Sequence, residues 1–196
     1  MDSHARYEDE SWEGSDLAGT EAEAVELLDM RLEKVELTGS VMPRWSVKGT
    51  RFGECSLANL EAPRSEWIAT ELHGCRLTGM DLRDSTGRHL LFADCRADLI
   101  SLRAARLEGA VFRDCLLSQA DLSDADLSGA RFERCDLTEV ELRGARLVGA
   151  VFDGCRMEGL RGAAALRGAR MRWDDIVGLA GAFAVELGIE LIEEDA

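Results

Sequence analysis

Six cysteines recur at intervals of twenty residues along this chain of 196 residues, and this period limits the possible folds more than any other feature. Another regular set of residues, each Phe or Leu, stands three positions before the cysteines. The two sets are Cys55, Cys75, Cys95, Cys115, Cys135 and Cys155, and Phe52, Leu72, Phe92, Phe112, Phe132 and Phe152. The strict spacing leaves no insertion or deletion between these repeats and indicates a repeat architecture.

A shorter repeat of five residues runs within each block of twenty. Its centre is large and apolar, as at Leu102, Leu107 and Phe112, and a small residue such as Ala105 or Ala110 stands two positions before the next centre. A helix repeats its apolar residues every 3.6 positions and a strand every two, so neither element fits. We expect the centre and the small residue to point inward together, as alternate residues of a strand do, with the chain turning after every five residues.

Four sides of five residues make one coil of twenty, and successive coils would stack about 4.8 Å apart. Each column of cysteines or phenylalanines would then be one position of the interior, repeated coil after coil. Glycine recurs in the turn position, where a tight corner favours a positive φ. The glycines in this position that we single out are Gly49, Gly109, Gly129 and Gly149.

The segment QADLSDADLSGARF, from Gln119 to Phe132, resembles the pentapeptide-repeat family, whose pattern is A-[DN]-L-x-x. The resemblance covers roughly Ser15 to Met171. It implies an all-β solenoid, a right-handed quadrilateral parallel β-helix of about seven to eight coils. We therefore divide the chain into an acidic N-terminal segment (1–14), the solenoid (15–171) and a C-terminal cap (172–196).

Some stretches fit the repeat less well. The segment AEAVELLDM, residues 22–30, also reads as a helical turn. Ala62, Pro63 and Trp67 disturb one coil, and Gly87 leaves another without its central residue; a bulged surface feature is the alternative there. Near Gly162 the repeat slips by one residue, which indicates the last coil.

The tail after residue 172 is expected to cap the open end of the solenoid, which would otherwise expose unpaired backbone and apolar core. Asp174 and Asp175 favour a helix start, Gly188 a helix end, and Ile189 and Leu191 a short strand. Apolar residues cover more than one side of this helix. In gyrase-directed members of the family the C-terminal helix forms a dimer, so the resemblance implies a homodimer. Its expected contact residues are Ile176, Val177, Leu179, Ala180, Phe183 and Leu187.

The sequence contains no recognisable catalytic constellation, so we expect no enzyme, no metal and no cofactor. His4, His73 and His89 lack metal-ligand spacing. The cysteines invite a disulfide or metal interpretation, but each takes a small inward position that is otherwise held by Ala. We therefore expect them to be buried structural thiols.

The formal net charge of −15 opposes direct binding of nucleic acid and favours a basic protein partner. Most of this excess lies near the ends, because residues 21–169 hold 25 acidic side chains against 20 Lys and Arg. Nothing near residue 1 reads as a signal peptide, and no apolar run is long enough to span a membrane. A cytoplasmic protein without membrane attachment is the expectation.

One outward position gathers acidic residues on successive coils. We single out Glu61, Asp81, Asp121 and Glu141, with Asp84 and Asp124 on the same side. Ser101 interrupts the run, and Arg83, Arg103 and Arg143 would neutralise part of it. The resemblance to loop-free quinolone-resistance members implies a DNA mimic that binds DNA gyrase or topoisomerase IV and modulates it or protects it from drugs or toxins. The alternative is a scaffolding module for another protein.

Overall fold

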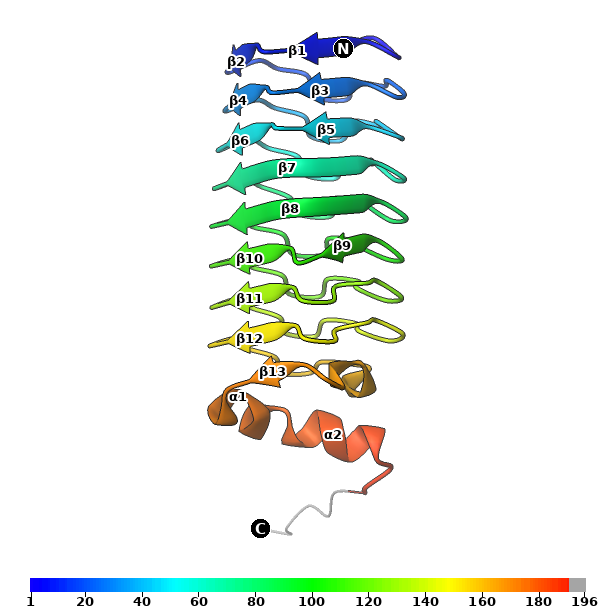
Figure 1. The fold of residues 1–196 in the computed structure, drawn as a ribbon, viewed down its shortest axis with the longest axis vertical. Coiled ribbons are helices and arrows are strands. Elements are labelled where there is room, and N and C mark those ends of the chain that lie inside the picture. The colour runs from blue at the N-terminus through cyan, green and yellow to red at the C-terminus, as the bar shows by residue number, and fades with distance from the viewer. Residues whose placement is uncertain (191–196) are drawn as a thin grey trace.

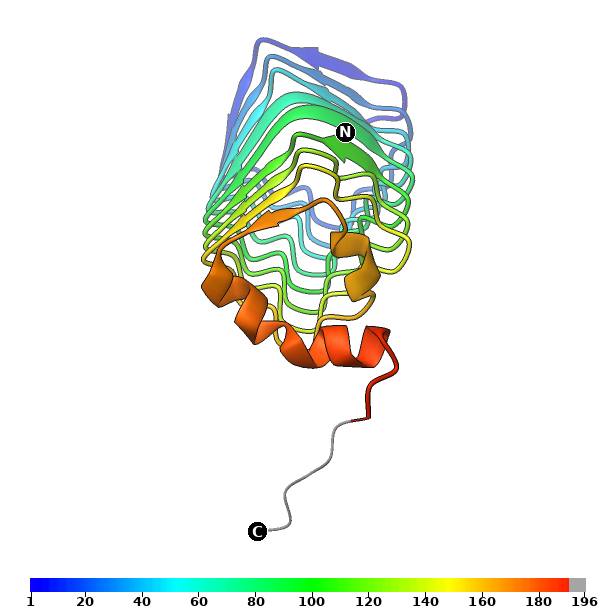
Figure 2. The same cartoon turned by 60° about the horizontal axis from the view of Figure 1, so that its bottom comes forward.

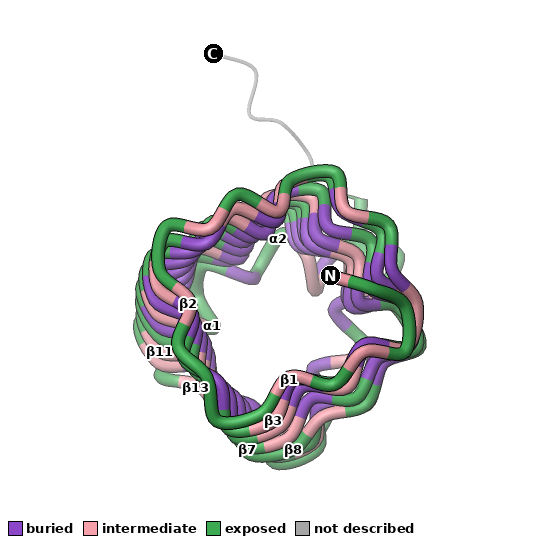
Figure 3. The backbone as a smooth tube through the Cα atoms, turned by 90° about the horizontal axis from the view of Figure 1, so that it is seen from above, coloured by how far each residue is buried: buried purple, intermediate pink, exposed green. Residues whose placement is uncertain are grey.

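The computed structural model describes residues 1–190 and shows a right-handed, four-sided parallel β-solenoid that is closed at one end by helices (Figure 1). Residues twenty positions apart lie beside each other in register, as Phe112 does with Phe132 and Phe132 with Phe152. Viewed end-on, the coils superpose in a rounded four-sided outline (Figure 3). The predicted architecture is confirmed.

Two neighbouring sides of the solenoid carry the regular strands. One side holds β1 (Arg6–Glu8), β3 (Glu26–Leu28), β5 (Ser46–Lys48) and β9 (Arg106–Glu108). The next holds β2 (Ser11–Glu13), β4 (Arg31–Glu33), β6 (Arg51–Gly53), β10 (Val111–Arg113), β11 (Arg131–Glu133), β12 (Val151–Asp153) and β13 (Arg170–Met171). Strands β7 (Glu66–His73) and β8 (Thr86–Ala93) run through the corner and belong to both sides. Isolated bridges with the same spacing of twenty hold the other two sides together.

The corners have one backbone conformation throughout. Every residue whose number ends in 4 or 9, from His4 to Gly159, has a positive φ. The glycines predicted for this position, such as Gly129 with φ 69°, are among them. No β-branched residue occupies a corner, which agrees with the high cost of this conformation for such side chains.

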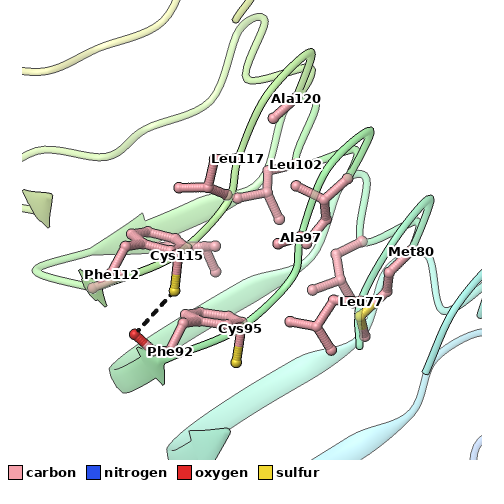
Figure 4. Close-up of a cluster of buried hydrophobic side chains, with 14 of the residues drawn as sticks. Leu77, Met80, Phe92, Cys95, Ala97, Leu102, Phe112, Cys115, Leu117 and Ala120 are labelled. Atoms are coloured by element: carbon pink, nitrogen blue, oxygen red, sulfur yellow. Dashed lines mark hydrogen bonds between the residues drawn. The ribbon is translucent and has the colours of Figure 1, made fainter. Parts of the chain in front are cut away.

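The interior is a set of columns, as expected. The rings of Phe92, Phe112, Phe132 and Phe152 stack with centroids 4.7, 5.0 and 4.8 Å apart. Beside them run the six cysteines, all buried and unpaired by disulfides. The Cys115 thiol donates to the carbonyl oxygens of Phe92 (3.4 Å) and Arg113 (3.3 Å) (Figure 4). The neighbouring Cys115 thiol, together with burial, raises the pKa of Cys135 to about 12, so this thiol stays protonated.

The irregular coils keep the same path with different packing. Residues 22–30 contain strand β3 (Glu26–Leu28) and no helix. Trp45 takes a position that other coils give to a small residue, while Ala62 takes one that they give to a large residue. The Trp45 ring meets those of Trp67 and Phe52 at centroid distances of 5.4 and 6.1 Å. An aromatic cluster of Trp45, Phe52 and Trp67 thus packs the interior in the coils before the phenylalanine stack.

The solenoid begins before Ser15, the expected start. Strands β1 and β2 both lie within residues 1–14, and β1 pairs with β3 in the same register of twenty. The acidic N-terminal segment therefore forms most of the first coil.

The C-terminal end leaves the repeat as predicted, with a slip of one residue. Gly162 turns the chain with φ 77° into a 3-10 helix, η1 (Ala163–Leu166). Met171 then pairs with Phe152, which is nineteen positions earlier instead of twenty.

Two short helices, α1 (Trp173–Gly178) and α2 (Ala180–Glu186), lie across this end (Figure 2). We predicted one helix, whereas the structure interrupts it at Leu179. Gly188 follows α2 with φ 68°, as expected of a helix end. Of the predicted short strand, Ile189 is not in a strand and Leu191 lies outside the described residues.

Candidate functional site

The structure brings the predicted acidic residues together on one side of the solenoid. Backbone bridges join residues twenty positions apart on successive coils, so the rod holds these carboxylates in a single row. We call Glu61, Asp81, Asp121 and Glu141 the acidic column. The bridges run from Glu61 to Asp81, Ser101, Asp121, Glu141 and finally Arg161.

The carboxylates of this column also stabilise the chain that carries them. Asp121 accepts a hydrogen bond from the backbone N–H of Ser123 at 2.9 Å, two residues later. Asp81 and Glu141 make the same contact at 3.0 Å, and their side chains are only 16% exposed. This structural role was not predicted from the sequence.

The same contact recurs on other sides, where Ser or Thr follows the acid by two positions. Asp126 accepts from the backbone N–H of Ser128 at 3.1 Å and from its hydroxyl at 2.6 Å. The Ser128 hydroxyl holds the pKa of Asp126 below its usual value, and the Thr38 hydroxyl does the same for Glu36. The recurring Asp-Leu-Ser and Glu-Leu-Thr triplets were the sequence signal for this role.

Two of the three arginines expected to neutralise the acidic column, Arg83 and Arg143, do so, whereas Arg103 forms no ion pair with it among the described residues. Arg83 pairs with Asp81 at 2.8 Å. Glu141 is flanked by Arg143 at 3.2 Å and by Arg161 at 3.1 Å. Within residues 1–190, Glu61 and Asp121 have no ion-pair partner. The column is therefore acidic but interrupted.

Asp84 and Asp124, which we call the corner pair, lie on the corner beside this column. Both have φ 58° and exposed side chains. Asp124 reaches over Gly144 on the next coil, where a Cβ atom would clash with Asp124 Oδ1 unless the Asp124 side chain moved. Arg64 takes the same corner position as Asp84 one coil earlier. This corner thus accepts either charge without a change in backbone conformation.

The residues expected to form a dimer do not share one surface. Leu179 is buried against the last coil, and Phe183 is half-buried there. Ile176, Val177, Ala180 and Leu187 are exposed. Sequence reasoning missed three further exposed apolar residues at this end: Trp173, Val185 and Ile189.

Other candidate chemistry is sparse in the part of the chain that the structure describes. His73 contacts Glu71 at 2.9 Å, and His89 is an exposed corner residue. Among residues 1–190 no cluster of His, Cys, Asp and Glu side chains has the arrangement of a metal site. None of the helices described is long and apolar enough to cross a bilayer.

Comparison with known proteins gives one family match and several distant structural likenesses. Residues 65–142 match the model of the pentapeptide repeat region. No curated protein matches the chain. Among solved structures, a pentapeptide repeat protein from the Arabidopsis thaliana thylakoid lumen is 31% identical over 56% of this chain and 70% of its own, with a TM-score of 0.39.

Two further solved structures are similar at lower identity. HetL, involved in heterocyst differentiation regulation in the cyanobacterium Nostoc, is 19% identical over 86% of this chain and 90% of its own, with a TM-score of 0.36. QnrB1, a plasmid-mediated fluoroquinolone resistance protein, is 16% identical over 94% of this chain and all of its own, with a TM-score of 0.37. At these scores none of the likenesses assigns a function.

Proposed function

Since this chain belongs to the pentapeptide-repeat family, we propose that it is a non-catalytic rod that occupies the DNA-binding surface of a type II topoisomerase, DNA gyrase or topoisomerase IV. Such binding would modulate the enzyme or protect it from drugs or toxins. The observation that supports this proposal is the acidic column, with the corner pair beside it, on a rod of fixed spacing. A basic surface that normally binds DNA is complementary to such a side.

The amount of charge decides how the rod would bind. Double-stranded DNA carries one negative charge per about 1.7 Å of its axis. The acidic column offers at most one carboxylate per coil, about every 4.8 Å, with Ser101 in place of an acid on one coil, and arginines neutralise part of it. Shape and a few exposed carboxylates must therefore carry the binding, and its salt dependence should be less steep than that of DNA.

We place a homodimer at the C-terminal end, which would double the length of the rod. Exposed apolar side chains in α1 and directly after α2 support this arrangement, among them Trp173, Val177 and Leu187. A groove of about 640 Å³ between η1 and the helices adds apolar surface, lined by Leu166, Met171 and Phe183 among others. Large exposed apolar surface of this kind is typical of an interface.

The test is a supercoiling assay with purified DNA gyrase or topoisomerase IV, with and without a quinolone. The expected result is inhibition by the rod alone and protection of the enzyme when the drug is present. The informative variant is Asp84→Lys with Asp124→Lys. It reverses exposed charges at a corner where Arg64 already shows that a basic residue is accepted.

Asp94→Lys with Glu139→Lys is the matched control. These exposed residues also occupy corners with positive φ, but on two other edges of the rod. The proposal requires loss of the effect in the first variant and retention in the second. Equal loss in both would assign the effect to overall charge, and no effect of the wild-type protein at micromolar concentration would exclude the topoisomerase.

A second candidate is a scaffolding module that binds another protein through one side of the rod. The nearly balanced charge of residues 21–169 favours it, because a mixed-charge surface suits many protein partners. A rod that leaves supercoiling unchanged, yet is retained by a non-topoisomerase partner in a charge-dependent manner, would support this function.

A further inference from the structure

The N-terminal end of the solenoid is open, unlike the end covered by α1 and α2. No residue before Ala22 is buried, and among residues 1–190 no helix or loop lies over the first coil (Figure 3). Met1, Tyr7, Trp12 and Leu17 are partly buried against the core at this end. The first coil is therefore the terminal edge of a parallel sheet.

This edge exposes backbone N–H groups whose equivalents in the following coils are hydrogen-bonded to the preceding coil. Among the strands of the described residues, β1 pairs only with β3, and β2 only with β4. In the second coil, the N–H groups of Glu26, Arg31 and Glu36 donate to the first coil at 2.9–3.0 Å. By the repeat of twenty, the equivalent N–H groups of Arg6 and Ser11 point away from the second coil. An exposed row of this kind is a template for another strand.

The charge of this end favours one kind of strand. Residues 1–30 carry ten acidic side chains and a single arginine. Farther along the rod, outward side chains of adjacent coils form ion pairs such as Arg113–Glu133 at 3.0 Å. A strand stacked on the first coil would place its outward side chains beside Glu8, Glu13 and Asp16 in the same way.

We propose that the first coil is a strand-addition site for an extended, Lys- and Arg-rich segment of a partner protein. Backbone hydrogen bonds to β1 and β2 supply the affinity, and ion pairs to Glu8, Glu13 and Asp16 select basic sequences. If two copies of this chain stacked through their first coils, the glutamates of one copy would lie beside those of the other, as close as outward side chains of adjacent coils are. Head-to-head self-association is therefore disfavoured. The site is separate from the acidic column and does not depend on a topoisomerase partner.

Hydrogen exchange followed by mass spectrometry tests this site with the full-length protein. The probe is a synthetic peptide that alternates lysine with valine, and its control alternates glutamate with valine. We expect the lysine peptide to slow exchange at the amides of Arg6–Glu13 at least tenfold, with no change at the C-terminal helices. The glutamate peptide should leave every amide unchanged.

Charge variants separate strand addition from general attraction. Glu8→Lys with Glu13→Lys should remove the protection, and Glu8→Gln with Glu13→Gln should weaken it, which guards against a folding defect in the first variant. Glu108→Lys with Glu158→Lys changes the same charge at exposed residues of later coils and should have no effect.

Three results would overturn the proposal. One is the absence of protection from exchange in the first coil at millimolar lysine peptide. The acidic residues would then serve only to prevent edge-to-edge association. The others are equal protection by both peptides, and a doubled mass of the protein alone with protection of its first coil.

Discussion

At the scale of single residues, the corner is the most constrained position of the repeat. All corners from His4 to Gly159 have positive φ, and twenty of them are occupied by residues other than glycine. Each such residue costs about 1–2 kcal/mol relative to an ordinary conformation. The solenoid tolerates this because every corner also allows the stacked backbone hydrogen bonds on both sides of it.

Substitutions at Gly129 measure the cost of positive φ alone, because a Cβ atom there would contact no neighbour. Gly129→Val should lower the free energy of unfolding by about 2 kcal/mol, and Gly129→Asn by less than about 1 kcal/mol, because Asn accepts positive φ. Urea denaturation measures both. Equal destabilisation by the two variants would show that φ is not the controlling factor.

Asp126 makes stability depend on pH. The Ser128 hydroxyl holds the pKa of Asp126 below its usual value of 3.8. Its contribution is thus fully present above the usual pKa and is lost as the pH falls through the lower pKa of the folded state. Between about pH 5 and pH 2 the wild-type protein should lose more stability than Asp126→Asn, which keeps the acceptor but cannot titrate. Thermal unfolding at several pH values measures this, and identical losses would contradict it.

At the scale of the elements, strand β8 shows how one coil accommodates a missing central residue. A Cβ at Gly87 would lie 2.6 Å from Leu90 Cδ1 and 2.8 Å from Leu107 Cδ2, so these leucines already fill the space. The sequence alone showed only that a core residue was missing.

A double-mutant cycle tests this packing. Gly87→Val should cost about 1–3 kcal/mol by overpacking, and Leu107→Ala about 2–5 kcal/mol by leaving a cavity. The double variant should be more stable than the sum of the two losses predicts, because the valine side chain would occupy the cavity that Leu107→Ala leaves. Strict additivity in denaturant unfolding would show that the two residues do not compete for space.

Helices α1 and α2 give a prediction about oligomeric state. Val177 and Leu187 are 58% and 74% exposed in one chain. We expect Val177→Lys with Leu187→Lys to convert a dimer into a monomer, since the charges would be buried without partners. Leu99→Lys, at an exposed leucine in the middle of the rod, is the control. Light scattering measures the mass; a monomeric wild-type protein would contradict the arrangement.

The elements also show what the sequence could and could not predict. The period of five located the strands, the columns and the slip near Gly162, because each depends on side-chain size at fixed spacing. The interruption at Leu179 was not predictable, since it follows from how the tail packs on the last coil. The hydrogen bonds of Asp81 and Asp121 to their own turns were missed because they need coordinates of the corner.

At the scale of the whole molecule, the rod converts a sequence period into a surface with fixed spacing. The acidic column follows from that period, whereas its degree of neutralisation depends on which arginines reach it. Arg83 and Arg161 do so. The candidate surface could therefore be located from the sequence, but its effective charge could not.

The most direct test of the proposed role is displacement of DNA from a type II topoisomerase, followed by the fluorescence anisotropy of a labelled duplex. If the rod takes the place of DNA, its addition should release the duplex completely. Raising the salt concentration should lower the affinity of the rod for the enzyme less steeply than it lowers the affinity of DNA. A complex that holds the rod and the labelled duplex at the same time would contradict the account.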